Sequence, residues 1–378
     1  MTRVAIATTT IFPLRFLPAY ADNLLKYGRT GEVIIYIAGD WKSPAGCLAE
    51  ADVQKRRGID VRYLPIEVQI DYLARFPELA HCIPENSDNR RNVAFLMALE
   101  EGADIVISMD DDNYCIPDVD FVAEHMACGS VRSHPEAVGA GGWYNPCALL
   151  VSTTHDRRLY PRGFPYRKRM EGTDQLADKT AGRVGINVGL WMGDPDVDAI
   201  GRLHARPWVS AWNQQTVLLG RGIRCPINTQ NTSLTREAMA AYYYVRMNEP
   251  MGGLVIDRFG DIFSGYFAQV CADAVGDRIR IGPPIVDHRR NPHNIFLDLF
   301  HELAGMMILE DLASFLSKVR LPGENYSQAY LALSYQVEEF ARAQEGFIWQ
   351  KECKEFFQTI ARNMRTWTDV VKSLVRSV

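Results

Sequence analysis

Long apolar runs are absent from this chain of 378 residues. The longest, such as Val33–Ala38, are far too short to span a membrane. The first residues also lack the extended apolar region of a signal peptide. The sequence therefore predicts a cytoplasmic protein that does not bind a membrane.

Cysteine pairs and an excess of positive charge are missing as well. The eight cysteines are scattered without any C-x-x-C spacing, which is typical of reduced, intracellular thiols and argues against zinc held by thiolates. Lys and Arg total 41 against 46 Asp and Glu, for a net charge of −5. Because binding to a phosphate backbone needs a basic surface, we expect no nucleic-acid partner.

The common cofactor fingerprints are lacking too. No Walker A loop occurs, and Gly139–Gly142 lacks the third glycine and the helix start of a dinucleotide-binding turn. The sequence therefore predicts neither flavin nor NAD, and it disfavours ATP.

A short apolar stretch, Ile105–Met109, runs directly into Asp110, Asp111 and Asp112. This pattern predicts a buried strand that ends in a charged site. Three adjacent carboxylates repel one another unless a cation neutralises them, and oxygen ligands suit Mn²⁺ or Mg²⁺. Asp110 and Asp112 could act on one ligand while Asp111 points elsewhere, and Asp110 and Asp111 are also predicted to contact the nucleotide. The alternative is a solvated turn, in which Asp is also common.

The first 112 residues alternate strand and helix patterns, as in a Rossmann-like α/β sheet. Ligands of such sheets bind at the carboxyl ends of the strands, so Thr8, Thr9 and Asp40 are predicted to line a nucleoside pocket, although they could be ordinary turn residues. A helix is predicted from a cap at Asp88–Asn89 to a stop at Gly102, which would place Arg91 beside the carboxylates.

The remainder of the chain changes character twice. From about 137 to 290 the pattern is mixed and rich in loops, which often carry specificity. Beyond residue 294 three amphipathic stretches predict long helices, over 295–319, 326–344 and 349–375. Their apolar positions are expected to pack against the α/β body or against a second subunit, and we expect a homo-oligomer.

Several segments carry a resemblance to a known family. The strand into the Asp triplet is similar to the nucleotide-sugar site of GT-A glycosyltransferases. Further segments resemble, in the same order, the reversibly glycosylated polypeptides, which are plant UDP-arabinopyranose mutases: Arg162–Arg169, Gly189–Trp191, Asp194–Asp198, Arg258–Asp261 and His288 with Asn291–Pro292. The resemblance implies a GT-A-like domain over 1–294, a C-terminal helical region over 295–378, and a metal-dependent, flavin-independent mutase that interconverts pyranose and furanose nucleotide sugars.

The same resemblance implies roles for individual residues. His288 would join Asp110 and Asp112 as a metal ligand, although a structural histidine is the alternative. Arg162 and Arg169 would contact phosphate or approach the anomeric carbon, because a guanidinium forms a rigid fork. Asp261 would move a proton between O4 and O5 of the sugar, unless it only caps a helix.

The substrate and the reaction each leave a choice. Likeness in length and loops to bacterial mutases of GDP-L-galactose implies a GDP-hexose more than a UDP-sugar. A glycosyltransferase that passes the sugar to a separate acceptor would use the same metal site. A non-catalytic binder of sugar nucleotides is the third reading.

Overall fold

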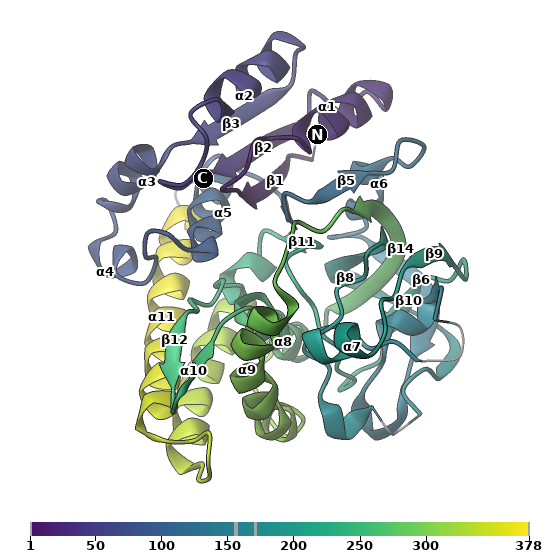
Figure 1. Ribbon diagram of the computed structural model, residues 1–378, viewed down its shortest axis with the longest axis vertical. Helices are drawn as coiled ribbons and strands as arrows, with labels where there is room; N and C mark the ends of the chain where they lie inside the picture. Colours follow the sequence, from purple (N-terminus) through teal and green to yellow (C-terminus); the bar gives the residue numbers. More distant parts are fainter. Residues whose placement is uncertain (1, 155–157, 170–171, 377–378) are drawn as a thin grey trace.

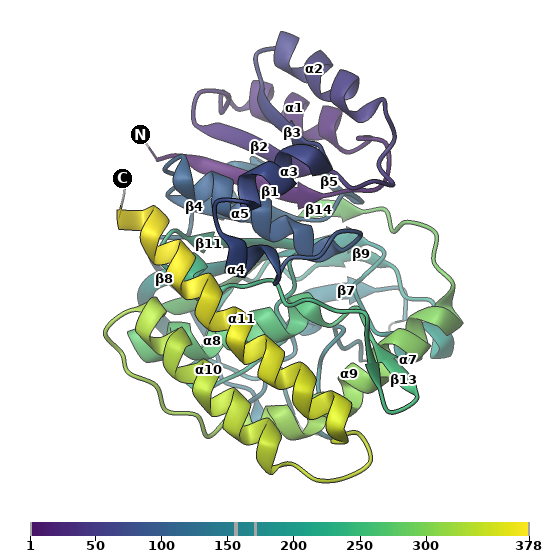
Figure 2. The ribbon, with the colours of Figure 1, turned by 90° about the vertical axis from the view of Figure 1, so that its left-hand side faces the viewer.

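The computed structural model describes residues 2–154, 158–169 and 172–376, and Figures 1 and 2 show its ribbon. The parallel N-terminal strands are β1 (Val4–Thr9), β2 (Val33–Ala38), β3 (Asp60–Leu64) and β4 (Ile105–Met109). The remaining strands are β5 (Asn113–Cys115), β6 (Val131–Ala137), β7 (Leu150–Ser152), β8 (Leu176–Gly193), β9 (Val209–Trp212), β10 (Val217–Leu219), β11 (Asn231–Thr235), β12 (Glu249–Met251), β13 (Leu254–Ile256) and β14 (Arg278–His288).

The helices are α1 (Leu17–Lys26), α2 (Cys47–Arg56), α3 (Ile66–Leu73), α4 (Pro77–Ala80), α5 (Arg91–Glu100), α6 (Phe121–His125), α7 (Ala199–His204), α8 (Gly260–Val275), α9 (Ile295–Leu316), α10 (Tyr326–Ala343) and α11 (Lys351–Arg376). Short 3₁₀ turns are η1 (Asp88–Arg90), η2 (Ala140–Gly142), η3 (Pro146–Leu149), η4 (Tyr166–Lys168) and η5 (Ala238–Ala241). No helix in the described ranges is both long enough and apolar enough to cross a bilayer.

The predicted Rossmann-like half is confirmed. Strands β3, β2, β1 and β4 lie side by side in parallel, because their β-branched and apolar residues are buried on both faces by helices. The observed cap differs from the expected one. The side chain of Ser87, rather than Asp88 or Asn89, accepts from the Asn89 backbone N–H and begins the turn that leads into α5.

The loop-rich middle region contains more strand than its sequence pattern indicates. Strand β11 pairs antiparallel with β4 on one side and with β8 on the other. The 18 residues of β8 pair with β6 along the first half and with β14 along the second. One mixed sheet therefore carries β4, with its Asp triplet, and β14, with His288, to the same edge.

The predicted C-terminal helices are confirmed as α9, α10 and α11. Asn294 and Asn325 cap α9 and α10 with their side chains, which explains where these helices begin. Figure 2 shows α10 and α11 side by side along the body, and their apolar faces contact η5 and α8 or α5. The fold is a mixed α/β sheet with flanking helices, followed by a packed helical region.

A buried histidine at the end of α6 packs against the mixed sheet, and we expect it to make folding sensitive to acid. His125 contacts the Ser233 hydroxyl and the Asn231 amide oxygen, each at 2.9 Å, and burial lowers its pKa to about 4. The folded state thus prefers the neutral ring, so stability is complete above the unfolded pKa of about 6.5 and falls as the pH drops toward 4. The expected loss is about 3 kcal/mol.

Urea unfolding of wild type and of His125→Gln over that pH range checks this prediction. The variant cannot ionise at this position, so its free energy of unfolding should lose less between neutral pH and pH 4. Equal pH dependence in the two proteins would contradict it.

Candidate functional site

Two adjoining cavities open at the carboxyl ends of the parallel strands. The smaller, of about 300 Å³, is lined by residues that follow β1, β2 and β4, including Thr9, Asp40 and Asp110, together with Arg91. The larger, of about 650 Å³, is strongly polar, and its lining includes residues of α8 and β14. The residues that line both cavities are Asn86, Ser87, Asp88, Asp110, Asp112 and Tyr244. The predicted crevice at the strand ends is therefore present, and the Asp triplet stands where its two parts meet.

The three aspartates differ in their partners. Asp110 accepts from Arg91 Nη2 at 2.7 Å, while burial raises its pKa against this attraction. Asp111 turns away, accepting from the Thr10 hydroxyl at 2.5 Å and from the Asn291 amide at 3.2 Å, and burial raises its pKa to about 6. The sequence analysis expected this divergence between Asp111 and its neighbours.

Asp112 faces His288 across the site. Its Oδ2 lies 3.3 Å from His288 Nε2 and accepts from the Asn291 backbone N–H at 3.2 Å. Burial opposes ionisation of this carboxyl, but the contact with His288 holds the pKa of Asp112 below its ordinary value. His288 Nδ1 lies against the Asp194 carbonyl, which fixes the ring with Nε2 toward the cavity.

The donor set fits a divalent cation that a ligand would complete. Among the described residues no group of three or more His, Cys, Asp or Glu side chains is arranged to enclose a metal on its own. Mg²⁺ in phosphate-binding sites commonly uses one or two carboxylates together with phosphate oxygens. Asp110 and Asp112 supply such carboxylates beside a cavity, and their mutual repulsion favours a cation.

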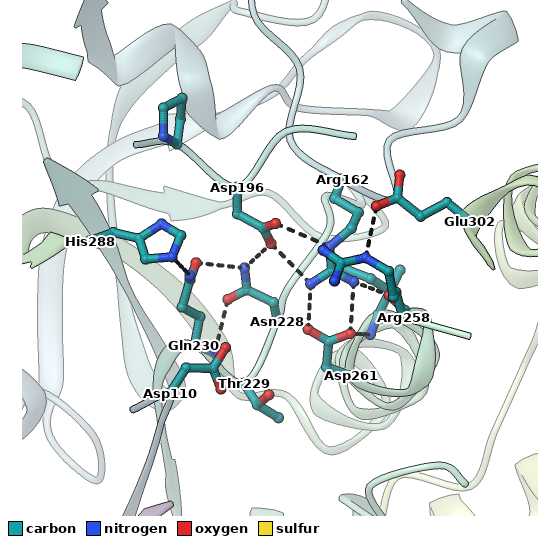
Figure 3. A network of polar contacts seen from close by, with 12 residues as sticks. Asp110, Arg162, Asp196, Asn228, Thr229, Gln230, Arg258, Asp261, His288 and Glu302 are labelled. Atoms are coloured by element: carbon teal, nitrogen blue, oxygen red, sulfur yellow. Dashed lines mark hydrogen bonds and ion pairs between the residues drawn. The ribbon is translucent and has the colours of Figure 1, made fainter. Parts of the chain in front are cut away.

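Arg162 lies between two buried carboxylates on the wall of the larger cavity (Figure 3). Its Nε and Nη2 donate to Asp196 at 3.1 and 3.0 Å, and its Nη1 and Nη2 donate to Asp261 at 3.0 and 2.8 Å. The fifth N–H donates to the Arg258 carbonyl. All five donors are engaged, so Arg162 does not present the free phosphate-binding fork that the sequence analysis allowed.

The Arg258 backbone is itself held in an unusual shape. Its φ of 59° lies in the left-handed region, which costs a residue with a side chain about 1–3 kcal/mol. Its Nε donates to Glu302 at 3.0 Å, as Figure 3 shows, and this buried ion pair stabilises the turn. In this backbone conformation the Arg258 carbonyl accepts a hydrogen bond from Arg162.

Asp261 has its carboxylate committed to Arg162. Oδ1 also accepts from the Ile262 backbone N–H at 2.9 Å, at the start of α8. With both oxygens paired to a guanidinium that never deprotonates, this carboxylate is a poor carrier of protons. The structure therefore favours an ion-pair role for Asp261 over the predicted proton transfer.

Two predicted residues lie away from the cavities. Arg169 pairs with Asp198 and lines a separate apolar cavity of about 250 Å³, so the structure does not bring it to the two cavities, and its contact with the substrate stays a prediction. Thr8 is fully buried in β1, and its hydroxyl donates to the Thr9 carbonyl, so Thr9 lines the pocket instead. Side chains alternate along a strand, which is why only one of the two threonines faces the cavity.

The sequence analysis missed Asp196, Asp88 and Tyr244. Asp196 lies in a segment that carried the family resemblance, but it was given no role. Asp88 was expected only as a helix cap. The spacing from Asp88 to Arg91, one helical turn, was a usable signal that both side chains lie near the same strand end.

The chain is an α/β protein whose Rossmann-like strand ends open onto two adjoining cavities, the place where sheets of this kind bind ligands. The family model described as "Reversibly glycosylated polypeptide" matches residues 81–376, and the chain belongs to this family. Its Arabidopsis thaliana relatives include "Probable UDP-arabinopyranose mutase 4", 24% identical over 78% of this chain and 74% of the relative. "UDP-arabinopyranose mutase 3" is 27% identical over 60% of this chain and 57% of that relative.

Solved structures give a more distant likeness. Glucosyl-3-phosphoglycerate synthase from Mycobacterium tuberculosis, in complex with Mn²⁺, uridine diphosphate and glucosyl-3-phosphoglycerate, is similar with a TM-score of 0.41 and 12% identity. The similarity covers 83% of this chain and 79% of that one.

Proposed function

We propose that this protein is a divalent-metal-dependent, flavin-independent mutase that interconverts the pyranose and furanose forms of a nucleotide sugar. The observation that carries the proposal is the meeting of a nucleotide-sized cavity and a larger polar cavity at Asp110 and Asp112. The diphosphate would lie at the junction and the sugar in the larger part. The names of the plant relatives agree with this reaction.

The Asp triplet and its neighbours would bind the diphosphate. Asp110 and Asp112 would hold Mn²⁺ or Mg²⁺ together with oxygens of the diphosphate, His288 would join them once that ligand completes the site, and Arg91 donates to Asp110. When bound, the metal supplies positive charge that stabilises the departing nucleotide diphosphate. The proposed reaction uses neither flavin nor NAD.

Arg162, Asp196 and Asp261 would lie beside the sugar. Arg162 lines the larger cavity but not the smaller one, so we place it beside the sugar and not at the base. One guanidinium with two carboxylates has a net charge of −1, which stabilises positive charge developing at the anomeric carbon. Arg162 already holds the two carboxylates in place, so they need not move as that charge forms.

We further propose that the nucleotide is GDP. Asp40 lines the smaller cavity, and among the described residues its Oδ1 accepts a single long contact of 3.4 Å, from the Lys42 backbone N–H. Guanine offers two neighbouring donors, N1–H and the N2 amino group, which a carboxylate accepts together. Uracil offers one N–H between two carbonyl oxygens, which a carboxylate repels. The named relatives act on UDP-arabinopyranose, so this assignment would distinguish the present chain from them.

Calorimetric titration with GDP and UDP tests that assignment. Asp40→Asn should weaken GDP binding by about tenfold or more, because it loses a hydrogen bond to a charged acceptor worth about 1.5–3 kcal/mol. UDP binding should change less. Tighter binding of UDP than GDP by the wild-type protein would contradict the assignment.

A glycosyltransferase is the second candidate. One relative is named "Probable glycosyltransferase STELLO1", 23% identical over 72% of this chain and 35% of the relative, and the larger cavity could admit an acceptor. A transferase would release one nucleotide diphosphate for each sugar transferred, whereas a mutase retains it. The expected homo-oligomer remains part of the proposal, and light scattering tests it.

Isotope exchange tests whether the bond to the anomeric carbon breaks during the proposed reaction. A nucleotide sugar labelled with ¹⁸O in the bridge between the anomeric carbon and phosphorus is incubated with protein and Mn²⁺. Label should move to non-bridging positions, because the bond breaks and the retained diphosphate rotates. Isomerisation without any such movement would refute bond cleavage, and consumption of the sugar nucleotide would favour a transferase or hydrolase.

A further inference from the structure

Asp88 occupies the wall where the two cavities meet. It is the first residue of η1 and lines both cavities. Its Oδ2 accepts from the Tyr244 hydroxyl at 2.6 Å, and its Oδ1 lies 3.4 Å from the Ser87 hydroxyl. The Tyr244 ring in turn lies against the Arg91 guanidinium, with 5.6 Å between the guanidinium carbon and the ring centre. Two hydroxyl contacts therefore hold Asp88 at the junction.

Asp88 differs from the other aspartates of the larger cavity in its partners. Five of the six aspartates there face a cationic or imidazole side chain: Asp110 faces Arg91, Asp112 faces His288, Asp196 and Asp261 face Arg162, and Asp257 lies 3.8 Å from His301. Within the described part of the chain Asp88 forms no ion pair. Among the described residues it is the aspartate of that cavity that no cationic or imidazole side chain contacts.

The surroundings of Asp88 favour a proton. The Asp88 side chain is exposed toward the two cavities. The protein around it still partly desolvates its carboxyl, which raises its pKa above the ordinary value. Of the charged and titratable groups facing it, the Tyr244 hydroxyl and Arg91 lower the pKa, whereas Asp257 and Asp261 raise it. A group that accepts and returns protons works best when its pKa lies closer to neutrality.

We propose that Asp88 carries the proton between O4 and O5 of the sugar during ring exchange, a role that rests on the mutase function proposed above. Tyr244 is its positioning residue. Because Asp88 borders both cavities, it lies beside the place where the anomeric carbon leaves the diphosphate and where the sugar ring begins.

The atoms and electrons balance without any further reactant. The bond between the anomeric carbon and the diphosphate oxygen breaks, and its electron pair leaves with the nucleotide. A lone pair of O4 then bonds to the anomeric carbon as the O4 proton passes to the Asp88 carboxylate. The bond from the anomeric carbon to O5 breaks next, its pair stays on O5, and Asp88 returns the proton to O5. Attack by a diphosphate oxygen on the same carbon completes the furanose.

This scheme separates two measurable events. Cleavage of the anomeric bond needs no proton from Asp88, whereas ring exchange does. Asp88→Asn keeps the size of the side chain and an oxygen that accepts from Tyr244, but it cannot carry a proton. The variant should therefore retain ¹⁸O exchange between bridging and non-bridging positions while isomerisation falls about 100-fold or more.

Asp311→Asn is the matched control. Asp311 lies on α9, lines neither of the two cavities, and accepts from Trp349 Nε1 at 2.7 Å. Both rates should stay close to those of wild type. Tyr244→Phe, which leaves the Asp88 carboxylate in place but removes its donor, should shift the pH profile of isomerisation upward and lower its rate less than Asp88→Asn does.

The outcomes distinguish the two proposals. Near wild-type isomerisation by Asp88→Asn overturns the role of Asp88, and so does loss of exchange and isomerisation together in a variant that still binds nucleotide. Absence of both exchange and isomerisation in wild type overturns the mutase function instead. Retained exchange with lost isomerisation supports both.

Discussion

Replacement of Arg162 by lysine is expected to lower turnover by about 100-fold or more, which corresponds to about 2.7 kcal/mol of lost transition-state stabilisation. A lysine ammonium keeps the charge, but its three N–H donors cannot form the two parallel pairs to Asp196 and Asp261. The two carboxylates would shift, and the charge beside the anomeric carbon would no longer be fixed.

The fold should survive this change, because the positive charge that pairs the two buried aspartates is retained. Steady-state kinetics and thermal unfolding measure both effects. Arg167→Lys is the matched control, since the Arg167 side chain is 78% exposed and contacts Glu310. If Arg162→Lys turned over like the Arg167 variant, the buried ion pairs of Arg162 would serve the fold and not the reaction.

Removal of the metal is expected to have an effect of similar size. Metal-free protein and Asp112→Ala should each lose at least about 100-fold in turnover, because a bound divalent cation supplies several kcal/mol of charge stabilisation to a departing diphosphate. Mn²⁺ should restore the metal-free wild type but not the variant. Calorimetric titration with Mn²⁺ in the presence of nucleotide should show weakened binding to Asp112→Ala.

Asp118→Ala is the control for that experiment. The Asp118 side chain is 93% exposed and pairs with Lys26 on the surface, so its loss should leave metal binding and turnover unchanged. Full activity of wild type after exhaustive chelation would contradict the assignment of Asp110 and Asp112 to a metal.

The N-terminal half of the fold was predictable because its sequence and its environment agree. β4 is a run of apolar residues buried on both faces, and its bounds match the predicted ones. β11 shows why the middle of the chain was not predictable. Its sequence Asn-Thr-Ser-Leu-Thr is typical of a loop, yet all five residues are buried. Contacts from distant elements, such as His125 on Ser233, satisfy these polar groups, and no local pattern reveals them.

The site was predictable to the extent that strand ends determine it. Asp110, Asp112 and His288 come together because β4 and β14 end at the same edge of the sheet. The sequence did not predict that Arg162 and Arg169, at the two ends of the basic loop, line different cavities. Gly163 has a φ of 80° and reverses the chain, so that Arg162 points into the larger cavity and Arg169 into another one.

The central claim, that a nucleotide sugar is isomerised and not consumed, is tested most directly by chromatography from both directions. GDP-hexopyranose and its furanose isomer are incubated separately with the protein and Mn²⁺ until no further change occurs. The account predicts the same ratio of the two isomers from either starting point, with no free nucleotide diphosphate formed. Stoichiometric release of nucleotide diphosphate, or no conversion of either GDP- or UDP-linked sugars, would contradict it.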